Sequence, residues 1–234
     1  MKVLAAAILA LTLMFSGCAS IPHVEHDIPP KIMSWAHQNI WQVGTSAGSG
    51  SGFFLDDDTF ITACHVVREG TFNTEGNLIV LIRNQRDTRV IQMTLQECWG
   101  DEDVAVLTPT EHKHSDKVTT SPTPLALEVP RQGKVVYGVG YPLGMPLTAT
   151  LGHIQNKLEL GPKKISWLVT TNTIMGDSGS PVLALIDGKV QVVGLRSAIR
   201  VIPQGMGLRA FLPHLTIMVP AFVIQQVIDE PLHQ

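Results

Sequence analysis

Apolar residues between positions 40 and 107 occur in short runs, each bounded by turn-forming residues. The runs cover residues 52–55, 60–63, 78–82 and 104–107. Three consecutive aspartates, residues 56–58, follow the first run, and the polar segment 73–77 precedes the third. Runs of this length between turn signals are typical of β-strands joined in hairpins, not of helices. The pattern therefore predicts an antiparallel, β-rich first half.

A second series of apolar runs follows residues 108–124, a stretch that contains three prolines and no apolar run. The later runs cover residues 135–139, 165–170, 181–186 and 190–195 and predict a second set of strands. Near the end, apolar residues recur at helical spacing within residues 220–229, which begin with a proline. We therefore expect two β-rich halves, a linker between them and a closing helix.

The first seventeen residues predict a targeting segment. Lys2 precedes an apolar run from Val3 to Phe15, and the small residues Ser16 and Gly17 then lead to Cys18. This run has the length of a signal peptide and is short for a bilayer span. It resembles a bacterial lipoprotein signal, in which cleavage precedes a cysteine that carries diacylglycerol. An ordinary secretory signal is the alternative, and both predict export.

The lipoprotein resemblance implies that Cys18 is the lipidation site and that the chain is held on a membrane of the cell envelope. Ala19 is not an acid of the kind that retains lipoproteins at the inner membrane, which favours the outer membrane. Residues 18–37 are expected to form a tether, because residues 19–31 are rich in Pro, His and acidic residues without an apolar period. The N-terminal β domain is placed at residues 38–115, and the C-terminal β domain with its helix at residues 116–230.

Composition narrows the classes of function. With 17 basic against 20 acidic residues the net charge is −3, so the chain lacks the basic footprint of a nucleic-acid-binding protein. Three cysteines are too few for a four-thiolate zinc site. His112 and His114 form a spaced pair in the linker without an acidic or thiol cluster, which favours a solvated loop over a metal site.

The segment Gly176-Asp177-Ser178-Gly179-Ser180-Pro181 contains a candidate nucleophile. A serine hydroxyl is a weak nucleophile at neutral pH and needs an adjacent base and nearby N–H donors for the oxyanion. Glycines at 176 and 179 allow the tight turn that exposes such a serine. Alone the motif is weak evidence, because it lacks the strand-to-helix context of the hydrolase elbow.

Two upstream motifs supply the partners that a nucleophilic serine requires. Thr62-Ala63-Cys64-His65 places a histidine at the end of a predicted strand, and Asp103 directly precedes the apolar run 104–107. A histidine base needs a carboxylate to fix its tautomer and to stabilise the imidazolium. Asp101 and Glu102 compete with Asp103 for this role.

The order His65, Asp103, Ser178 is that of the chymotrypsin fold. With Gly50-Ser51-Gly52-Phe53 and Val193-Gly194-Leu195, these motifs make the chain resemble a trypsin-like serine protease over roughly residues 40–228. The resemblance is to the short bacterial kind near the HtrA and glutamyl endopeptidase branches. It implies an all-β fold of two six-stranded antiparallel β-barrels with a C-terminal helix, and it selects Asp103 as the orienting acid.

The resemblance further implies a serine endopeptidase that cleaves polypeptides through an acyl-enzyme on Ser178. The backbone N–H groups of Gly176 and Ser178 would form the oxyanion hole. No metal, organic cofactor or PDZ domain is expected. A binding or scaffolding protein that keeps the protease fold without turnover is the rival interpretation.

The same resemblance implies a primary substrate pocket lined by Asn172 and by Arg196, Ser197, Ala198 and Ile199. Because no acid stands at Asn172, a preference for basic substrate side chains is disfavoured. Arg196 falls where glutamyl endopeptidases have a histidine, so it could pair with an acidic substrate side chain. The alternative is that Arg196 points to solvent or to a structural acid.

Asp177 departs from HtrA-like chains, which usually carry asparagine there. In trypsin the corresponding aspartate pairs with a new N-terminus released by activation. For Asp177 we expect instead a lysine, an arginine or a backbone partner. Cys64 and Cys98 flank the candidate histidine and acid, and a disulfide between them is possible in an oxidising compartment.

Overall fold

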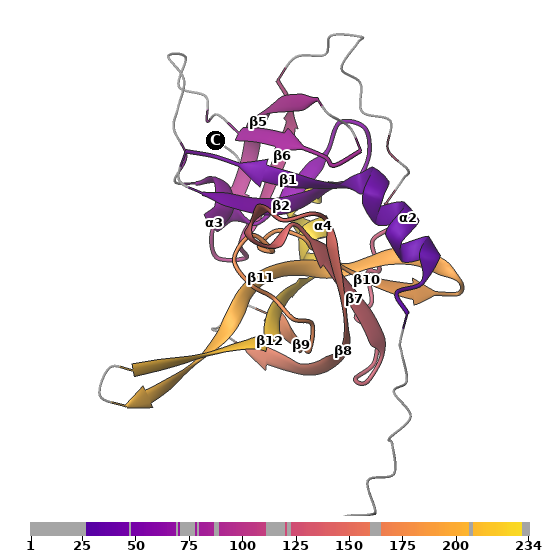
Figure 1. Cartoon of the computed structure of the whole chain (residues 1–234), viewed down its shortest axis with the longest axis vertical. Helices are drawn as coiled ribbons and strands as arrows, with labels where there is room; N and C mark the ends of the chain where they lie inside the picture. The colour runs from indigo at the N-terminus through magenta and orange to yellow at the C-terminus, as the bar shows by residue number, and fades with distance from the viewer. Residues whose placement is uncertain are drawn as a thin grey trace, which may run out of the picture.

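The computed structural model describes residues 27–230 except positions 47, 69, 71–77, 79, 87–88, 111–119, 121–122, 160–164 and 206–207. Within strands, the side chains of residues 199–211 and 213 are also outside the description. The expected signal peptide at residues 1–17, the expected lipidation site Cys18 and the histidines His112 and His114 lie outside the described residues. Two closed six-stranded antiparallel barrels form the body of the molecule, one above the other in Figure 1. The predicted fold class is confirmed.

The first barrel is built from short strands whose inward residues are bulky. Its strands are β1 (Ile40–Gly44), β2 (Ser49–Phe54), β3 (Phe60–Thr62), β4 (Val80–Arg83), β5 (Val90–Trp99) and β6 (Val104–Pro109). In β4 buried and exposed residues alternate, as expected for a strand with one face on the core. Three aromatic side chains pack together in this barrel, Trp41, Phe54 and Phe60, and Phe53 is buried as well.

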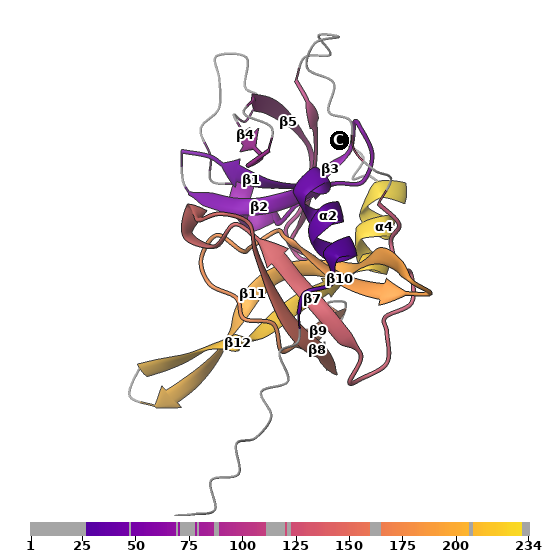
Figure 2. The same cartoon turned by 45° about the vertical axis from the view of Figure 1, so that its right-hand side comes forward.

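The second barrel has longer strands and a smaller-residue interior. Its strands are β7 (Val135–Gly140), β8 (Thr148–Glu159), β9 (Ile165–Val169), β10 (Pro181–Ile186), β11 (Lys189–Gly205) and β12 (Leu208–Pro220). Pairing of β10 with β7 closes this barrel. Strands β11 and β12 continue beyond the barrel as a two-stranded arm (Figures 1 and 2). The sequence predicted only residues 190–195 of β11.

The helices are short and cover the barrels from outside. They are α2 (Pro30–Asn39), α3 (Cys64–Val67), the 3₁₀ turn η1 (Pro142–Gly144) and α4 (Ala221–Asp229). The predicted closing helix corresponds to α4, which packs on β6, β11 and β12. In the described part of the chain, no helix combines the length and apolarity needed to cross a bilayer.

Helix α2 differs from the expected tether over residues 18–37. Pro30 starts the helix, and Ile32, Trp35 and Ala36 are buried at helical spacing against the body. Lys31 Nζ also donates a hydrogen bond to the carbonyl of Gly188, 3.2 Å away in the β10–β11 turn. Residues 30–37 therefore belong to the folded body, and the apolar face was missed because it contains only three residues.

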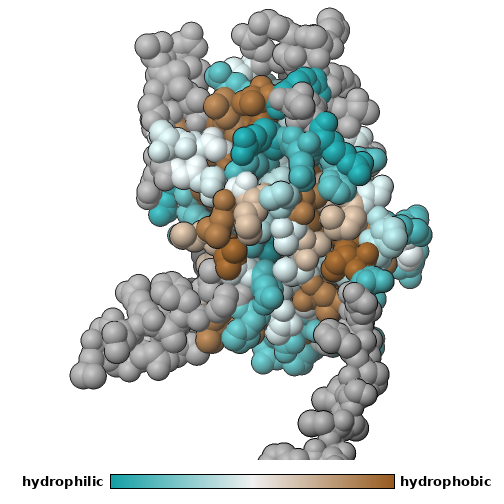
Figure 3. All heavy atoms as spheres, viewed as in Figure 1, coloured by the Kyte–Doolittle hydropathy of each residue, from teal (hydrophilic) through white to brown (hydrophobic). Residues whose placement is uncertain are grey.

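One continuous apolar core joins the two barrels. It includes Val43 and Ile61 of the first barrel together with Val139, Leu183 and Leu195 of the second. On the surface seen in Figure 3, by contrast, apolar residues form small patches separated by polar ones. The shared core fixes the two barrels against each other, so groups at their boundary keep a defined separation.

Candidate active site

His65 and Ser178 line the same cavity, of about 490 Å³, at the boundary of the two barrels. The other lining residues come from β2, α3, the η1 turn and the loop before β10: Gly48, Ser49, Val66, Leu143, Met175 and Gly176. The first barrel thus contributes the histidine and the second the serine. Residues separated by 113 positions in the sequence therefore face one space.

Asp103 holds the ring of His65. Both carboxylate oxygens lie close to His65 Nδ1, Oδ1 at 3.0 Å and Oδ2 at 2.9 Å, and the His65 backbone N–H donates to Oδ1 at 3.0 Å. Asp103 has a φ of 61°, a left-handed conformation that aspartate tolerates better than most residues. His65 stands on the single-turn helix α3, whereas the sequence placed it at the end of a strand.

The charge of Asp103 sets the tautomer of His65. Burial alone would raise the pKa of Asp103, but hydrogen bonds from His65 and Ser197 and the charge of His65 together lower it below its ordinary value. An ionised carboxylate only accepts hydrogen bonds, so Nδ1 must carry the proton. In the neutral ring Nε2 is then an acceptor, which is the form that a general base requires.

Ser197 supports this carboxylate from the second barrel. Its Oγ donates a 2.5 Å hydrogen bond to Asp103 Oδ2. The register of β11 shifts between Arg196 and Ala198, so Ser197 sits at a bulge, a feature that redirects side chains near active sites. Sequence reasoning assigned Ser197 to a substrate pocket and missed this contact, because a bulge leaves no clear mark in the strand pattern.

A disulfide joins Cys64 to Cys98 and connects α3 to β5. Because Cys98 pairs with Ala105 in the sheet, the bond ties the helix that carries His65 to the strand next to the one that follows Asp103. The bond that the sequence left open is therefore present. Cys64 is buried.

The loop that carries Ser178 depends on two glycines. Gly176 has a φ of 94° and Gly179 a φ of 85°, conformations that other residues rarely adopt. A Cβ on Gly179 would also lie 2.2 Å from the carbonyl oxygen of Ser51 and from Thr62 Oγ1. These glycines are therefore required both by conformation and by the close approach of β2.

The loop is tied to its surroundings through its carbonyl groups. The Leu143 N–H donates to the Met175 carbonyl at 2.7 Å, and Ser51 Oγ donates to the Gly176 carbonyl at 2.8 Å. The Asp177 carbonyl accepts from the Ser180 N–H at 3.0 Å and from Ser180 Oγ at 2.6 Å. Three consecutive carbonyls of the loop are thus fixed.

The N–H groups of Gly176 and Ser178 point away from these bonded carbonyls. All peptide bonds in the described chain are trans, so the Gly176 N–H points opposite to the Met175 carbonyl and the Ser178 N–H points opposite to the Asp177 carbonyl. Both of these carbonyls already accept hydrogen bonds. Among the described residues, neither N–H donates a hydrogen bond to an acceptor. Both residues line the cavity with His65. Within the described part of the chain, both N–H groups therefore lack an acceptor and are available to an oxygen atom in the cavity.

Ser178 Oγ is not hydrogen-bonded to His65 in the described structure. Its contact is with the carbonyl oxygen of Ser197, at 3.5 Å. Hydrogen bonds between a nucleophile and its base are often long or misaligned without substrate. The structure brings the two groups to one cavity without closing the bond between them.

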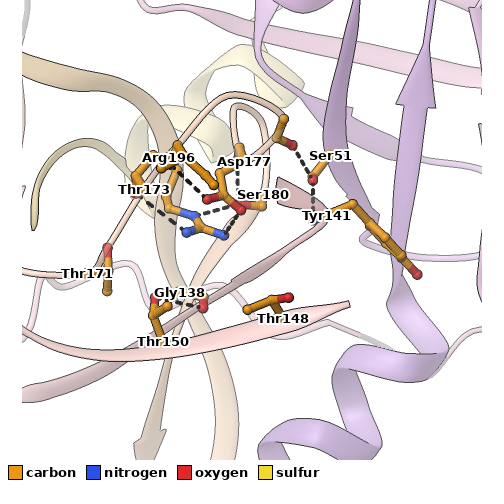
Figure 4. A network of polar contacts seen from close by, with 12 residues as sticks. Ser51, Gly138, Tyr141, Thr148, Thr150, Thr171, Thr173, Asp177, Ser180 and Arg196 are labelled. Carbon is orange, nitrogen blue, oxygen red and sulfur yellow. Dashed lines mark hydrogen bonds and ion pairs between the residues drawn. The ribbon is translucent and has the colours of Figure 1, made fainter. Parts of the chain in front are cut away.

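Arg196 does not occupy the substrate-facing position that the sequence suggested. Its side chain is 1% exposed, and its guanidinium contacts Asp177, Ser180 and Thr173 in the interior of the second barrel (Figure 4). The Nη2 atom lies 3.0 Å from Asp177 Oδ1. The alternative of a structural acid is therefore the one observed, and Arg196 is the partner expected for Asp177.

The remaining predicted pocket residues lie in different environments. Asn172 is exposed, and its carbonyl oxygen accepts a hydrogen bond from Arg196 Nη1 at 3.2 Å. Ala198 is exposed on β11, whereas the side chain of Ile199 lies outside the described residues. Asn172 therefore meets the cation through its backbone and leaves its side chain free.

Comparison with known proteins assigns the family. The model of the trypsin-like peptidase domain matches residues 50–195, more than half of the chain. The chain belongs to the trypsin-like peptidase family. A putative serine protease, HhoB of Synechocystis sp., is 30% identical over 173 residues, which cover 68% of this chain and 36% of HhoB. The chain thus spans about a third of the length of that relative.

Solved structures agree on the fold of this trypsin-like peptidase. The active form of the Rv3671c protease from M. tuberculosis aligns with a TM-score of 0.65 and 21% identity, covering 88% of this chain and 86% of that one. A serine endoprotease from Yersinia pestis aligns with a TM-score of 0.65 and 16% identity, covering 87% of this chain and 67% of that one. The two-barrel architecture is therefore shared with serine proteases of distant sequence.

Proposed function

We propose that the protein is a serine endopeptidase in which Ser178 is the nucleophile, His65 the general base and Asp103 the orienting acid. The observation that carries this proposal is the shared cavity, which brings Ser178 beside an imidazole whose Nδ1 is held by Asp103. The membership in the trypsin-like peptidase family supports the same reaction.

The proposed reaction begins when Ser178 Oγ attacks the carbonyl carbon of a substrate peptide and its proton moves to His65 Nε2. The negative oxygen that forms accepts hydrogen bonds from the N–H groups of Gly176 and Ser178. The imidazolium then gives its proton to the leaving amine as the peptide C–N bond breaks. Water, deprotonated by His65, finally cleaves the acyl ester and regenerates Ser178.

The proposal does not include a preference for acidic substrates. The charge of Arg196 is already paired with Asp177, and its side chain is sealed from solvent. Arg196 therefore offers no free cation to a substrate carboxylate. Exposed apolar groups at the cavity, including Leu143 and the 74%-exposed Met175, favour apolar contacts with the substrate instead.

A fluorophosphonate probe, which phosphonylates activated serines, tests this function. We expect labelling of the wild type and none of Ser178→Ala, with a fall in turnover of about 10⁵ to 10⁶ for that variant. Ser166→Ala is the matched control, because Ser166 is buried in β9, away from the cavity. Absence of labelling in the folded wild type would favour the rival interpretation, a protease fold used for binding.

We also propose that the protein is exported and anchored through a lipid on Cys18. The support is the pattern of residues 1–18: a lysine, an apolar run and small residues before a cysteine. Growth with radiolabelled palmitate should label the wild type and fail to label Cys18→Ser. Recovery of unlabelled wild-type protein from the soluble fraction would contradict the anchor.

A further inference from the structure

Asp177 stands between the two free N–H donors and is itself held on several sides. Its carboxylate is 4% exposed. Oδ2 accepts a hydrogen bond from the Ile174 N–H at 3.1 Å, and Oδ1 contacts Arg196 Nη2 at 3.0 Å. The loop therefore turns around this carboxylate, and a change in its position would move both donors.

Arg196 forms hydrogen bonds to the loop of Ser178 through both its backbone and its side chain. Its carbonyl accepts from the Gly179 N–H at 2.8 Å, and its own N–H donates to the Ser180 carbonyl at 2.8 Å. Its Nε donates to Ser180 Oγ at 2.5 Å, so the guanidinium plane bridges Ser180 and Asp177. Figure 4 shows the guanidinium among these groups, below the loop. Arg196 thus contacts residues on both sides of Ser178, Asp177 before it and Ser180 after it.

Strand β7 is shaped to receive the guanidinium. A Cβ on Gly138 would lie 3.0 Å from Arg196 Nη1, and a Cβ on Gly140 would lie 2.8 Å from Nη2 and 2.9 Å from Asp177 Oδ1. Residues two apart on a strand point to the same face, so the lack of a side chain at both glycines leaves space for the ion pair. The barrel wall has space for an arginine paired with an aspartate.

A buried ion pair of this kind is costly unless it is complete. Burial raises the pKa of the Asp177 carboxyl, and the Arg196 guanidinium opposes that shift. Removing either partner leaves an uncompensated charge in the interior, whereas removing both leaves none. The alignment of the loop therefore depends on the match between residues 177 and 196.

We propose that Arg196 is a positioning residue that supplies the internal cation for Asp177 and so holds the N–H groups of Gly176 and Ser178 toward the cavity. The inference rests on the proposed function of those donors. Because the cation comes from β11, the donor loop takes this conformation in the uncut chain, without a new N-terminus.

The pH dependence of probe labelling tests the role of the cation. Arginine stays charged throughout the accessible range, whereas a buried lysine loses its proton more readily. In the described chain, Asp177 is the titratable group in contact with the guanidinium; its other contacts are Ser180, Thr173 and the Asn172 carbonyl. We expect the labelling rate of the wild type to stay level from about pH 8 to 10, and that of Arg196→Lys to fall at least tenfold over this range.

A double-mutant cycle tests whether Arg196 acts through Asp177. Arg196→Met and Asp177→Asn should each lower the labelling rate about 10²-fold or more, while the double variant should return to within about tenfold of the wild type. Arg131→Met, at an exposed arginine before β7, is the matched control and should label like the wild type. Near-UV circular dichroism checks the folding of each variant.

The outcomes separate this inference from the proposed function. If the wild type reacts with the probe and the labelling rate of Arg196→Lys stays as level with pH as that of the wild type, the role of Arg196 is overturned. The endopeptidase proposal then stands. Additive losses in the double variant would overturn it as well. If Arg196→Met does not fold, the lysine profile decides alone. A wild type that does not react overturns both proposals.

Discussion

The two barrels hold their parts of the site by different means. The first barrel, which carries His65 and Asp103, has a core with packed aromatic rings, with the ring centroids of Trp41 and Phe54 5.8 Å apart, and a disulfide joins α3 to β5. In the second, the loop of Ser178 rests on a buried network of charges and hydroxyl groups centred on Arg196. The segments around the proposed base are thus stabilised by nonpolar packing and a covalent bond, and the loop of the proposed nucleophile by polar contacts.

Because of this difference, the two barrels should tolerate amino-acid substitutions differently. Apolar cores accept changes that conserve volume and lose stability gradually. A buried polar network is stable when every member is satisfied and fails when one charge loses its partner. We therefore expect core substitutions in the first barrel to change stability, and small changes around Arg196 to change the rate of reaction.

The largest effect on rate is expected from the contact between the Asp103 carboxylate and His65 Nδ1, on which the proposed base depends. In Asp103→Asn the amide can donate to Nδ1 and favour the wrong tautomer of His65, so kcat should fall by about 10⁴. Steady-state kinetics on a fluorogenic peptide measure this loss. A fall of less than tenfold would show that packing alone orients the ring.

The same substitution has a pH signature in stability. Because the folded protein lowers the pKa of Asp103, its ionised form stabilises the fold above the ordinary aspartate pKa of about 4, and this contribution is lost as the pH falls through the lower, folded value. The difference in melting temperature between wild type and Asp103→Asn should thus shrink as the pH falls from about 5 to below about 4. A difference that grows over this range would contradict the assignment.

An intermediate effect is expected from one methyl group beside the ion pair. Gly140→Ala places a Cβ 2.8 Å from Arg196 Nη2 and 2.9 Å from Asp177 Oδ1, two buried atoms that are paired with each other. We expect the probe labelling rate to fall about 10- to 100-fold with a loss of about 1–3 kcal/mol in unfolding free energy. Gly100→Ala, where a Cβ would meet nothing within 4 Å, is the control. Equal labelling of the two variants would mean that the network yields as easily as an apolar core.

The smallest effect on rate is expected in the aromatic core. Phe54→Ala removes a fully buried ring and should cost about 3–5 kcal/mol of stability. At a temperature where the variant stays folded, its labelling rate should remain within about twofold of the wild type, because the disulfide still fixes α3. Chemical denaturation and probe kinetics on the same sample measure both quantities. A rate loss larger than that of Gly140→Ala would reverse the proposed contrast between the barrels.

Much of the fold follows from local sequence patterns. Residues 181–186 match β10 and residues 220–229 match α4 to within one residue, because turn residues bound both segments sharply. Gly176 and Gly179 were also recognisable, since positive φ angles leave a mark in residue type. Features that need a particular backbone conformation are thus visible in the sequence.

The direction of individual side chains was less accessible. Arg196 was expected at the substrate pocket, although the alternating Gly138 and Gly140 on β7 signalled space for a large group inside the barrel. Helix α2 and the contact of Ser197 with Asp103 depend on tertiary packing across the chain, which short patterns do not encode. Orientation is set by partners from distant segments, so single-sequence reasoning identifies candidates better than their neighbours.

Two consecutive residues of β11 serve opposite halves of the molecule. Arg196 contacts the turn that carries the nucleophile, and Ser197 contacts the acid behind the base. Strand β11 therefore connects the turn that carries the proposed nucleophile to the acid that holds the proposed base, and a displacement of this strand would change both contacts.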